Sequence, residues 1–198
     1  MCLLIETIKI KNNRIYNIGY HNSRMNITRK ELFGYKNFID LSGFIEIPEN
    51  NNDTIKCRII YNKEIIKIEY NVYQKKNIKS LKVINSDDID YKHKYKDRNK
   101  IEELLKAKNN CDDILIIKND RITDTSFTNI AFYNGVKWLT PAYPLLKGTK
   151  RQKLLDENKI MEADIFLNEL NKFQRAILFN SMLDLEDEMY IEIDNIKL

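Results

Sequence analysis

The sequence contains no apolar run that approaches the roughly 20 residues needed to span a bilayer. Its first residues, Met-Cys-Leu-Leu-Ile-Glu, reach an acidic side chain at once and have no basic residues before them. This is not the pattern of a secretory signal peptide. No low-complexity linker and no internal repeat interrupts the 198 residues. These absences predict a cytoplasmic protein that does not bind membranes.

Cysteine and histidine are both scarce. The three cysteines, Cys2, Cys57 and Cys111, are an odd number at spacings that fit neither a disulfide framework nor a zinc site. No serine or cysteine stands in a context that would suit nucleophilic catalysis with His21 or His93, the only histidines. We therefore expect a reduced protein that holds no metal and uses both histidines structurally.

Charge of one sign is not concentrated anywhere along the chain. The net charge of +4 comes from lysines that alternate with acidic residues and asparagines, without an Arg-rich arm or an aromatic-interleaved basic stripe. Nucleic acid is therefore not an expected partner. A hydrophobic content of 43% in 198 residues is enough for a buried core, in one large domain or two small ones.

Alternation and turn residues predict an antiparallel sheet with one helix in the amino-terminal part. Asn12-Asn13 suits a turn, Asn22-Ser23 suits the start of a helix, and Gly34 suits its end. The expected strands are 3–10, 14–18, 55–61, 64–73 and 78–84, and the expected helix is 24–33. This pattern ends near Asp87-Asp88, which places a domain boundary after residue 88.

Residues 89–198 are predicted to form a second domain of mixed helices and strands. An amphipathic helix begins at Asp97, and Asn134-Gly135 is a strong hairpin signal. The expected strands are 114–117, 121–123, 129–133, 136–139 and 189–193, and the other expected helices are 149–157 and 164–182. The fold class is therefore α+β, in the two parts 1–88 and 89–198.

Two segments carry the most specific pattern. Residues 121–132 read Arg-Ile-Thr-Asp-Thr-Ser-Phe-Thr-Asn-Ile-Ala-Phe, and residues 145–151 read Leu-Leu-Lys-Gly-Thr-Lys-Arg. Together they resemble the cofactor-binding region of the class IV aminotransferase and aminodeoxychorismate lyase family, which are fold-type IV enzymes that use pyridoxal 5′-phosphate (PLP). The resemblance implies a two-domain enzyme. Its 1–88 part would be an antiparallel sheet with a helix, and its 89–198 part a pseudo-barrel-like α/β domain that binds PLP.

The resemblance assigns Asp124 to the pyridine nitrogen of PLP, where an acidic side chain keeps the ring protonated. The family has Glu at this position, one methylene longer. The local sequence also fits a simpler interpretation, in which Asp124 caps a turn with Thr125 and Ser126.

The phosphate of PLP is assigned to the start of a helix. Gly148-Thr149-Lys150-Arg151 corresponds to the family's Gly-Ile-Thr-Arg, so Thr149 and Lys150 are expected to bind the cofactor, and Leu146 is expected to pack on its ring. Backbone N–H groups at a helix amino terminus bind phosphate, and glycine allows a close approach. The alternative is an ordinary helix start preceded by a glycine.

Two further cofactor contacts are implied. Residues 20–25, Tyr-His-Asn-Ser-Arg-Met, resemble the family's His-x-x-Arg-Leu helix, whose arginine forks onto the phosphate, and this assigns Arg24. Ser181 lies where relatives have a Gly-Thr-Ala turn that contacts phosphate or substrate. An exposed helix arginine is the alternative for Arg24.

The lysine that bonds the PLP aldehyde is assigned to Lys94. In relatives it lies three residues before an Asn, which the lyases commonly follow with Arg, and Lys94-Tyr-Lys-Asp97-Arg98 fits with Asp in place of Asn. Lys96 is the second candidate. A solvated basic strand is the alternative interpretation of this lysine-rich region.

Within the family, the Asp97-Arg98 pair and the short chain favour 4-amino-4-deoxychorismate lyase, which releases pyruvate and leaves p-aminobenzoate during folate biosynthesis. An aminotransferase for D- or branched-chain amino acids, or a protein with the fold but without turnover, is the alternative. The implied partners are a small-molecule amino substrate and a second copy of the chain, because relatives are homodimers.

Overall fold

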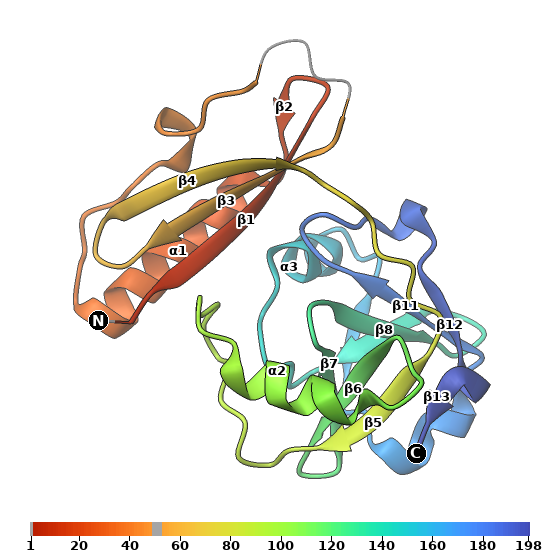
Figure 1. The fold of residues 1–198 in the computed structure, drawn as a ribbon. Helices are drawn as coiled ribbons and strands as arrows, with labels where there is room; N and C mark the ends of the chain where they lie inside the picture. Colours follow the sequence, from red (N-terminus) through yellow and green to blue (C-terminus); the bar gives the residue numbers. More distant parts are fainter. Residues whose placement is uncertain (1, 49–52) are drawn as a thin grey trace. The chain divides into compact units, whose positions relative to one another are not determined.

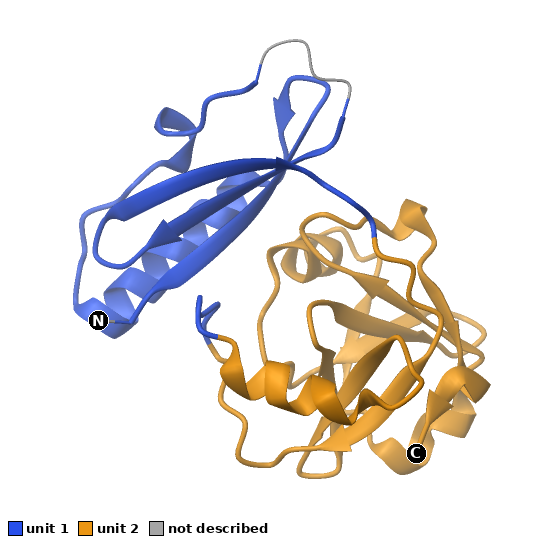
Figure 2. Cartoon of the chain, viewed as in Figure 1, with its two compact units in different colours: residues 1–75, 93–97 blue, residues 76–92, 98–198 orange. Residues whose placement is uncertain are grey.

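The computed structural model describes residues 2–48 and 53–198, and the chain divides into two compact units (Figure 2). Unit 1 comprises residues 1–75 and 93–97, and unit 2 comprises residues 76–92 and 98–198. The observed division therefore differs from the boundary expected after residue 88. The strand expected at 78–84 pairs within unit 2, and His93–Asp97 returns to pair with the first strand of unit 1.

Unit 1 is a four-stranded antiparallel sheet in the order β2-β1-β3-β4, with helix α1 along it (Figure 1). Asn12 and Asn13 both have φ near +50°, as a tight hairpin turn between β1 and β2 requires. The elements are β1 (Leu4–Lys11), β2 (Arg14–Ile15), α1 (Ile18–Phe33), the 3-10 turn η1 (Leu41–Gly43), β3 (Ile55–Tyr61) and β4 (Ile65–Val72). The predicted antiparallel sheet with one helix is confirmed.

Helix α1 begins six residues earlier than predicted. Its first bonds run from the N–H groups of Tyr20 and His21 to the carbonyl of Asn17. The expected cap, Asn22, lies inside the helix, where its side chain donates to Asp40 and accepts from the N–H of Leu41. A tertiary partner thus replaces the capping role that the local sequence predicted. The predicted end at Gly34 is confirmed, with φ +72°.

Unit 2 contains two mixed sheets, of order β13-β5-β6-β7 and β10-β9-β8-β11-β12 (Figure 1). Its elements are β5 (Leu81–Asn85), α2 (Asn99–Leu105), η2 (Lys106–Lys108), β6 (Asp113–Lys118), β7 (Arg121–Thr125), β8 (Asn129–Tyr133), β9 (Trp138–Pro141), α3 (Thr149–Asp156), β10 (Met161–Ala163), η3 (Leu167–Lys172), β11 (Arg175–Phe179), η4 (Leu185–Asp187), β12 (Tyr190–Glu192), η5 (Ile193–Asn195) and β13 (Ile196–Lys197). Helix α2 connects the parallel strands β5 and β6. Leu154 of α3 packs against Ala131 of β8 and Ile177 of β11. The α+β class is confirmed.

The helix expected at 164–182 is wrong. This segment instead forms η3 and strand β11, which pairs antiparallel with both β8 and β12. Its side chains Ala176, Ile177, Leu178 and Phe179 are all at most 1% exposed. A strand covered on both faces presents a continuous apolar run, and such a run cannot be distinguished from a buried helix by periodicity.

Among the residues that the structure describes, no helix combines the length and the apolar character needed to cross a bilayer.

Candidate functional site

Asp124 lies near the end of β7 and is only 5% exposed. Its Oδ1 accepts a hydrogen bond from Asn129 Nδ2 at 2.7 Å, and its Oδ2 accepts one from the backbone N–H of Leu146 at 2.9 Å. Asn129 also donates to the carbonyl of Leu146 at 3.0 Å. Burial raises the pKa of Asp124 to about 6, although the two hydrogen bonds act in the opposite direction. The carboxylate is therefore fixed in place and unusually basic.

The turn after Asp124 does not use that carboxylate as its cap. Thr125 performs this role, since its Oγ1 lies 2.7 Å from Thr128 Oγ1 and accepts from the N–H of Thr128 at 3.1 Å. Arg98 supports the same turn through a 2.5 Å bond to the carbonyl of Ser126. The simpler interpretation of Asp124 as a turn cap therefore does not describe the structure.

Gly148 brings the start of α3 against Asn129, the amide side chain that is hydrogen-bonded to Asp124. A Cβ added at Gly148 would lie 2.0 Å from Asn129 Oδ1, so only glycine fits without a rearrangement. The first bond within the helix runs from the N–H of Gln152 to the carbonyl of Gly148. The N–H groups of Thr149 and Lys150 precede that bond and are not used by the helix, which makes this end an anion-binding position.

The long side chains of the same helix turn have structural partners. The ammonium of Lys150 forms an ion pair with Asp184. Arg151, only 1% exposed, donates to the carbonyl of Pro141 at 2.8 Å and to Glu162 at 2.6 Å. Thr149 is 4% exposed. A phosphate at this helix end would therefore meet backbone N–H groups and the Thr149 hydroxyl, rather than the Arg151 guanidinium.

Ser181 is half-buried in the turn that closes the bridge between Asn180 and Leu183. Asn180 donates from Nδ2 to the carbonyl of Phe127 at 3.3 Å. This bond connects the Ser181 turn to the turn between β7 and β8. Unit 2 thus brings together Asp124, Leu146, Thr149 and Lys150 around one loop, and adds Ser181 through the neighbouring turn.

Arg24, the phosphate ligand expected from unit 1, is held by a buried acid. Its Nε and Nη2 donate to the two carboxylate oxygens of Glu6 at 2.9 and 2.5 Å. His21 Nδ1 lies 2.6 Å from Glu6 Oε2. Burial alone would raise the pKa of Glu6, but the charge of Arg24 and the bond from His21 outweigh it and hold the pKa at about 2. Burial lowers the pKa of His21 below its usual value.

Lys94 lies on the edge of β1 in unit 1. Its carbonyl accepts from the N–H of Ile5 at 2.9 Å, and the following Tyr95 bridges to Leu4. The half-buried Lys94 side chain is close enough to His21 for its charge to lower the pKa of that histidine. Lys96, the second candidate, is exposed. The structure therefore directs Lys94, and not Lys96, toward the buried Glu6–His21–Arg24 group.

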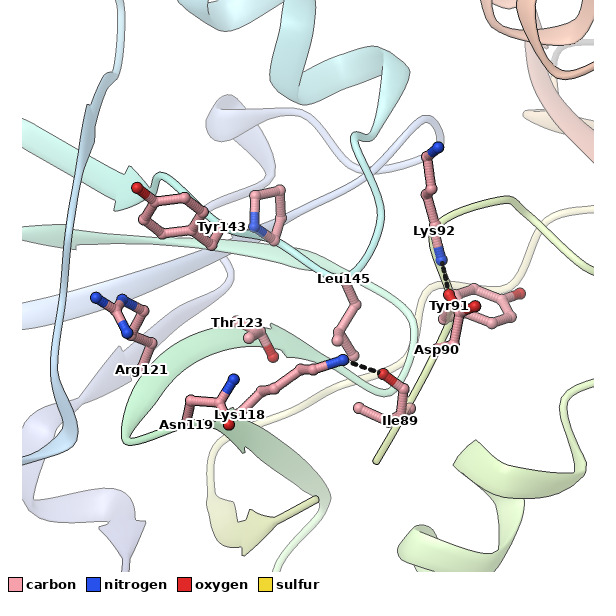
Figure 3. A pocket seen from close by; sticks show the side chains of 11 residues that line it. Ile89, Asp90, Tyr91, Lys92, Lys118, Asn119, Arg121, Thr123, Tyr143 and Leu145 are labelled. Atoms are coloured by element: carbon pink, nitrogen blue, oxygen red, sulfur yellow. Dashed lines mark hydrogen bonds between the residues drawn. The ribbon is translucent and has the colours of Figure 1, made fainter. Parts of the chain in front are cut away.

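A separate pocket of about 490 Å³ lies in unit 2 (Figure 3). Thr123 and Leu145 line it, each one residue before Asp124 and Leu146, so it lies on the opposite face of β7 from Asp124. Its cations already have partners. Lys118 donates to the carbonyl of Ile89 at 2.5 Å (Figure 3). Arg121 donates from Nε and Nη2 to the two carboxylate oxygens of Asp164. None of the predicted cofactor-binding residues lines this pocket.

Comparisons with known proteins identify the family. Residues 3–185 match the family described as Amino-transferase class IV. An uncharacterized protein of Haemophilus influenzae is 40% identical over 182 residues, which are 90% of this chain and 97% of that protein. A solved structure from Haemophilus somnus, named "putative 4-amino-4-deoxychorismate lyase", is 34% identical with a TM-score of 0.85, covering 92% of this chain and 97% of that one. The chain belongs to the class IV aminotransferase family.

The fold is shared more widely than the sequence. The PLP-bound form of a hypothetical aminotransferase from Mycobacterium tuberculosis has a TM-score of 0.75 at 15% identity, and covers 91% of this chain and 78% of that one. The predictions of family and fold class are thus confirmed. Membership of the class IV aminotransferase family indicates a PLP-dependent enzyme.

Sequence reasoning assigned no role to Asn129 or Glu6, and only a structural role to His21. Asn129 is part of the motif itself, and its position five residues after Asp124, across a hairpin turn, is a signal that the two side chains meet. Glu6 occupies a core-facing position of β1 between Leu4 and Ile8, and an acid at such a position indicates a buried partner. The identity of that partner depends on α1, which local sequence does not reveal.

Proposed function

We propose that the protein is a 4-amino-4-deoxychorismate lyase that uses PLP, eliminates pyruvate from its substrate and leaves p-aminobenzoate. The observation that carries the cofactor assignment is the buried carboxylate of Asp124. It accepts hydrogen bonds from Asn129 and from the N–H of Leu146, beside the start of α3. The choice of the lyase rests on Asp97-Arg98 after Lys94, and on the name given to the 34% identical Haemophilus somnus structure.

The residues of unit 2 fit the cofactor. Bound PLP would supply an electron-withdrawing pyridinium ring and an aldehyde that condenses with amines. A carboxylate with two donors already in place retains further acceptor positions, and its raised pKa makes it a strong acceptor for the pyridinium N–H. Asp124 would hold that proton, while the N–H groups of Thr149 and Lys150 would bind the phosphate and Leu146 would pack on the ring.

Arg24 and Lys94 are proposed for the other two functions. Glu6 fixes the plane of the Arg24 guanidinium. A guanidinium held in one plane is well placed to donate hydrogen bonds to two oxygens of a phosphate group. Lys94 would bond the cofactor aldehyde and, once released as a neutral amine, would accept the proton from the substrate Cα. Arg98, anchored at Ser126, would provide positive charge for a substrate with two carboxylates.

The first experiment combines absorbance with chemical trapping. The purified protein is mixed with PLP, its visible spectrum is recorded, and borohydride reduction is followed by peptide mass mapping. We expect a visible band and a pyridoxyl mass at Lys94. Lys94→Met should abolish the covalent product, whereas the matched control Lys96→Met should retain it. A pyridoxyl mass at Lys96 would move the assignment by two residues, and the absence of any band would refute the PLP proposal.

Product analysis then separates the possible reactions. Release of pyruvate and p-aminobenzoate without a keto-acid acceptor supports the lyase. Turnover that requires a keto acid would replace it with an aminotransferase for D- or branched-chain amino acids, and a bound cofactor without turnover of either kind would leave a binding protein. A homodimer in solution is also part of the proposal, and light scattering during size-exclusion chromatography tests it.

A further inference from the structure

Unit 1 contains a buried ionic cluster that the roles above do not require in full. Glu6 is fully buried in β1, His21 is fully buried in α1, and the Arg24 side chain is 16% exposed. Glu6 alternates with Leu4 and Ile8 on the face of β1 that packs in the core. A carboxylate at this position displaces an apolar side chain that would have suited the core.

Stability alone does not account for this cluster. Removing a carboxylate from water is strongly unfavourable, and a buried ion pair is often no more stabilising than apolar residues of the same volume. What a buried, fully bonded pair does provide is a single arrangement of its members. The cluster is therefore better suited to fixing an orientation than to strengthening the core.

The contacts define which group is oriented. Glu6 binds the edge of the Arg24 guanidinium that carries Nε and Nη2, through two bonds that together fix its plane. Nη1 is on the other edge and is not used by Glu6. The ionised Glu6 carboxylate can only accept hydrogen bonds, so His21 Nδ1–H is the donor to Glu6 Oε2 at 2.6 Å, and this bond restricts rotation of the carboxylate. Partial exposure leaves Arg24 within reach of a ligand.

We propose that Glu6 is the positioning residue for Arg24, and that recognition of the cofactor's phosphate depends on it. Glu6 acts through Arg24, and His21 acts through Glu6. Discrimination between PLP and pyridoxal, which lacks the phosphate, is therefore set by the β1 carboxylate as well as by the arginine. This inference rests on the proposed function, because it concerns how the same cofactor is recognised.

The test compares PLP with pyridoxal in Glu6→Gln, Arg24→Lys and the double variant. Dissociation constants are measured by absorbance titration, and thermal unfolding monitors the fold. Glu6→Gln keeps the shape of the side chain but removes the negative charge that accepts both hydrogen bonds from Arg24. We therefore expect PLP affinity to fall roughly tenfold or more while pyridoxal affinity stays within about twofold. The matched control is Glu64→Gln, because Glu64 is an exposed residue of the same unit, 3.8 Å from Arg29. It should leave both affinities unchanged.

The double variant decides whether Glu6 acts through the arginine. If it does, Glu6→Gln adds no further loss of PLP affinity to Arg24→Lys. Additive losses, an equal loss for PLP and pyridoxal, or tighter PLP binding by Glu6→Gln would each overturn the inference. Should Glu6→Gln fail to fold, His21→Leu replaces it: this variant removes the donor to Glu6 Oε2 and leaves both Arg24–Glu6 bonds, so a smaller loss of affinity, confined to PLP, is expected. If the wild-type protein binds neither compound, the proposed function itself fails.

Discussion

The buried carboxylate of Asp124 makes the stability of the cofactor-free protein depend on pH in a defined direction. Burial raises its pKa from 3.8 to about 6, so the folded state favours the protonated carboxyl. Such a group contributes stability that is fully present below pH 3.8 and is lost as the pH rises through 6. Lowering the pH from 7 to 5 should therefore stabilise unit 2.

The size of the effect follows from the two pKa values. With a change of about 1.36 kcal/mol per pKa unit, the Asp124 contribution to the free energy of unfolding grows by about 1.4 kcal/mol between pH 7 and pH 5. Other titrating groups also respond over this range. They respond equally in Asp124→Asn, so the difference between wild type and variant isolates the Asp124 term.

The assay is urea unfolding of the cofactor-free protein at both pH values, followed by the fluorescence of Trp138. This is the single tryptophan of the chain, and it lies in unit 2, so the signal reports the unit that holds Asp124. The stability of wild type relative to Asp124→Asn should rise by about 1.4 kcal/mol on going from pH 7 to pH 5. A constant difference, or one that changes in the other direction, would refute the assignment of a raised pKa.

Two further predictions concern the framework around the carboxylate. Gly148→Ala would place a methyl group 2.0 Å from Asn129 Oδ1, so we expect a loss of about 1–3 kcal/mol in the free energy of unfolding and weaker PLP binding, measured by the same fluorescence assay and by absorbance titration. Leu178→Ala removes a fully buried side chain from the middle of β11 and should lower the free energy of unfolding by about 2–5 kcal/mol; a loss below 1 kcal/mol would contradict the burial of this interior strand.

Local sequence predicted the parts of the site that lie on one hairpin and one helix start. Asp124 and Gly148 belong to two short segments whose residue types are characteristic, and the structure joins these segments through Asn129, a residue whose role was not predicted. The assignments of Arg24 and Lys94 remain predictions. The structure adds that both lie beside Glu6 and His21 in unit 1.

The failures of sequence reasoning all involve contacts between distant segments. Asn22 suits a helix cap, but Asp40 and Leu41 occupy its side chain, and α1 extends to Ile18. The β11 strand has the apolar content of a helix, and only its pairing with β8 and β12 decides its form. Propensity describes the chain locally, whereas these outcomes depend on partners brought together by the fold.

The return of His93–Asp97 to the sheet of unit 1 has a consequence for how the protein can be divided. The polypeptide passes between the units at three places, after residues 75, 92 and 97. A single proteolytic cut or truncation therefore cannot release either unit whole. A fragment ending at residue 75 would lose the 93–97 segment that contains Lys94 and expose the edge of β1 at Leu3–Ile5. Neither unit is a continuous stretch of the chain, so neither can be produced or exchanged as a single segment.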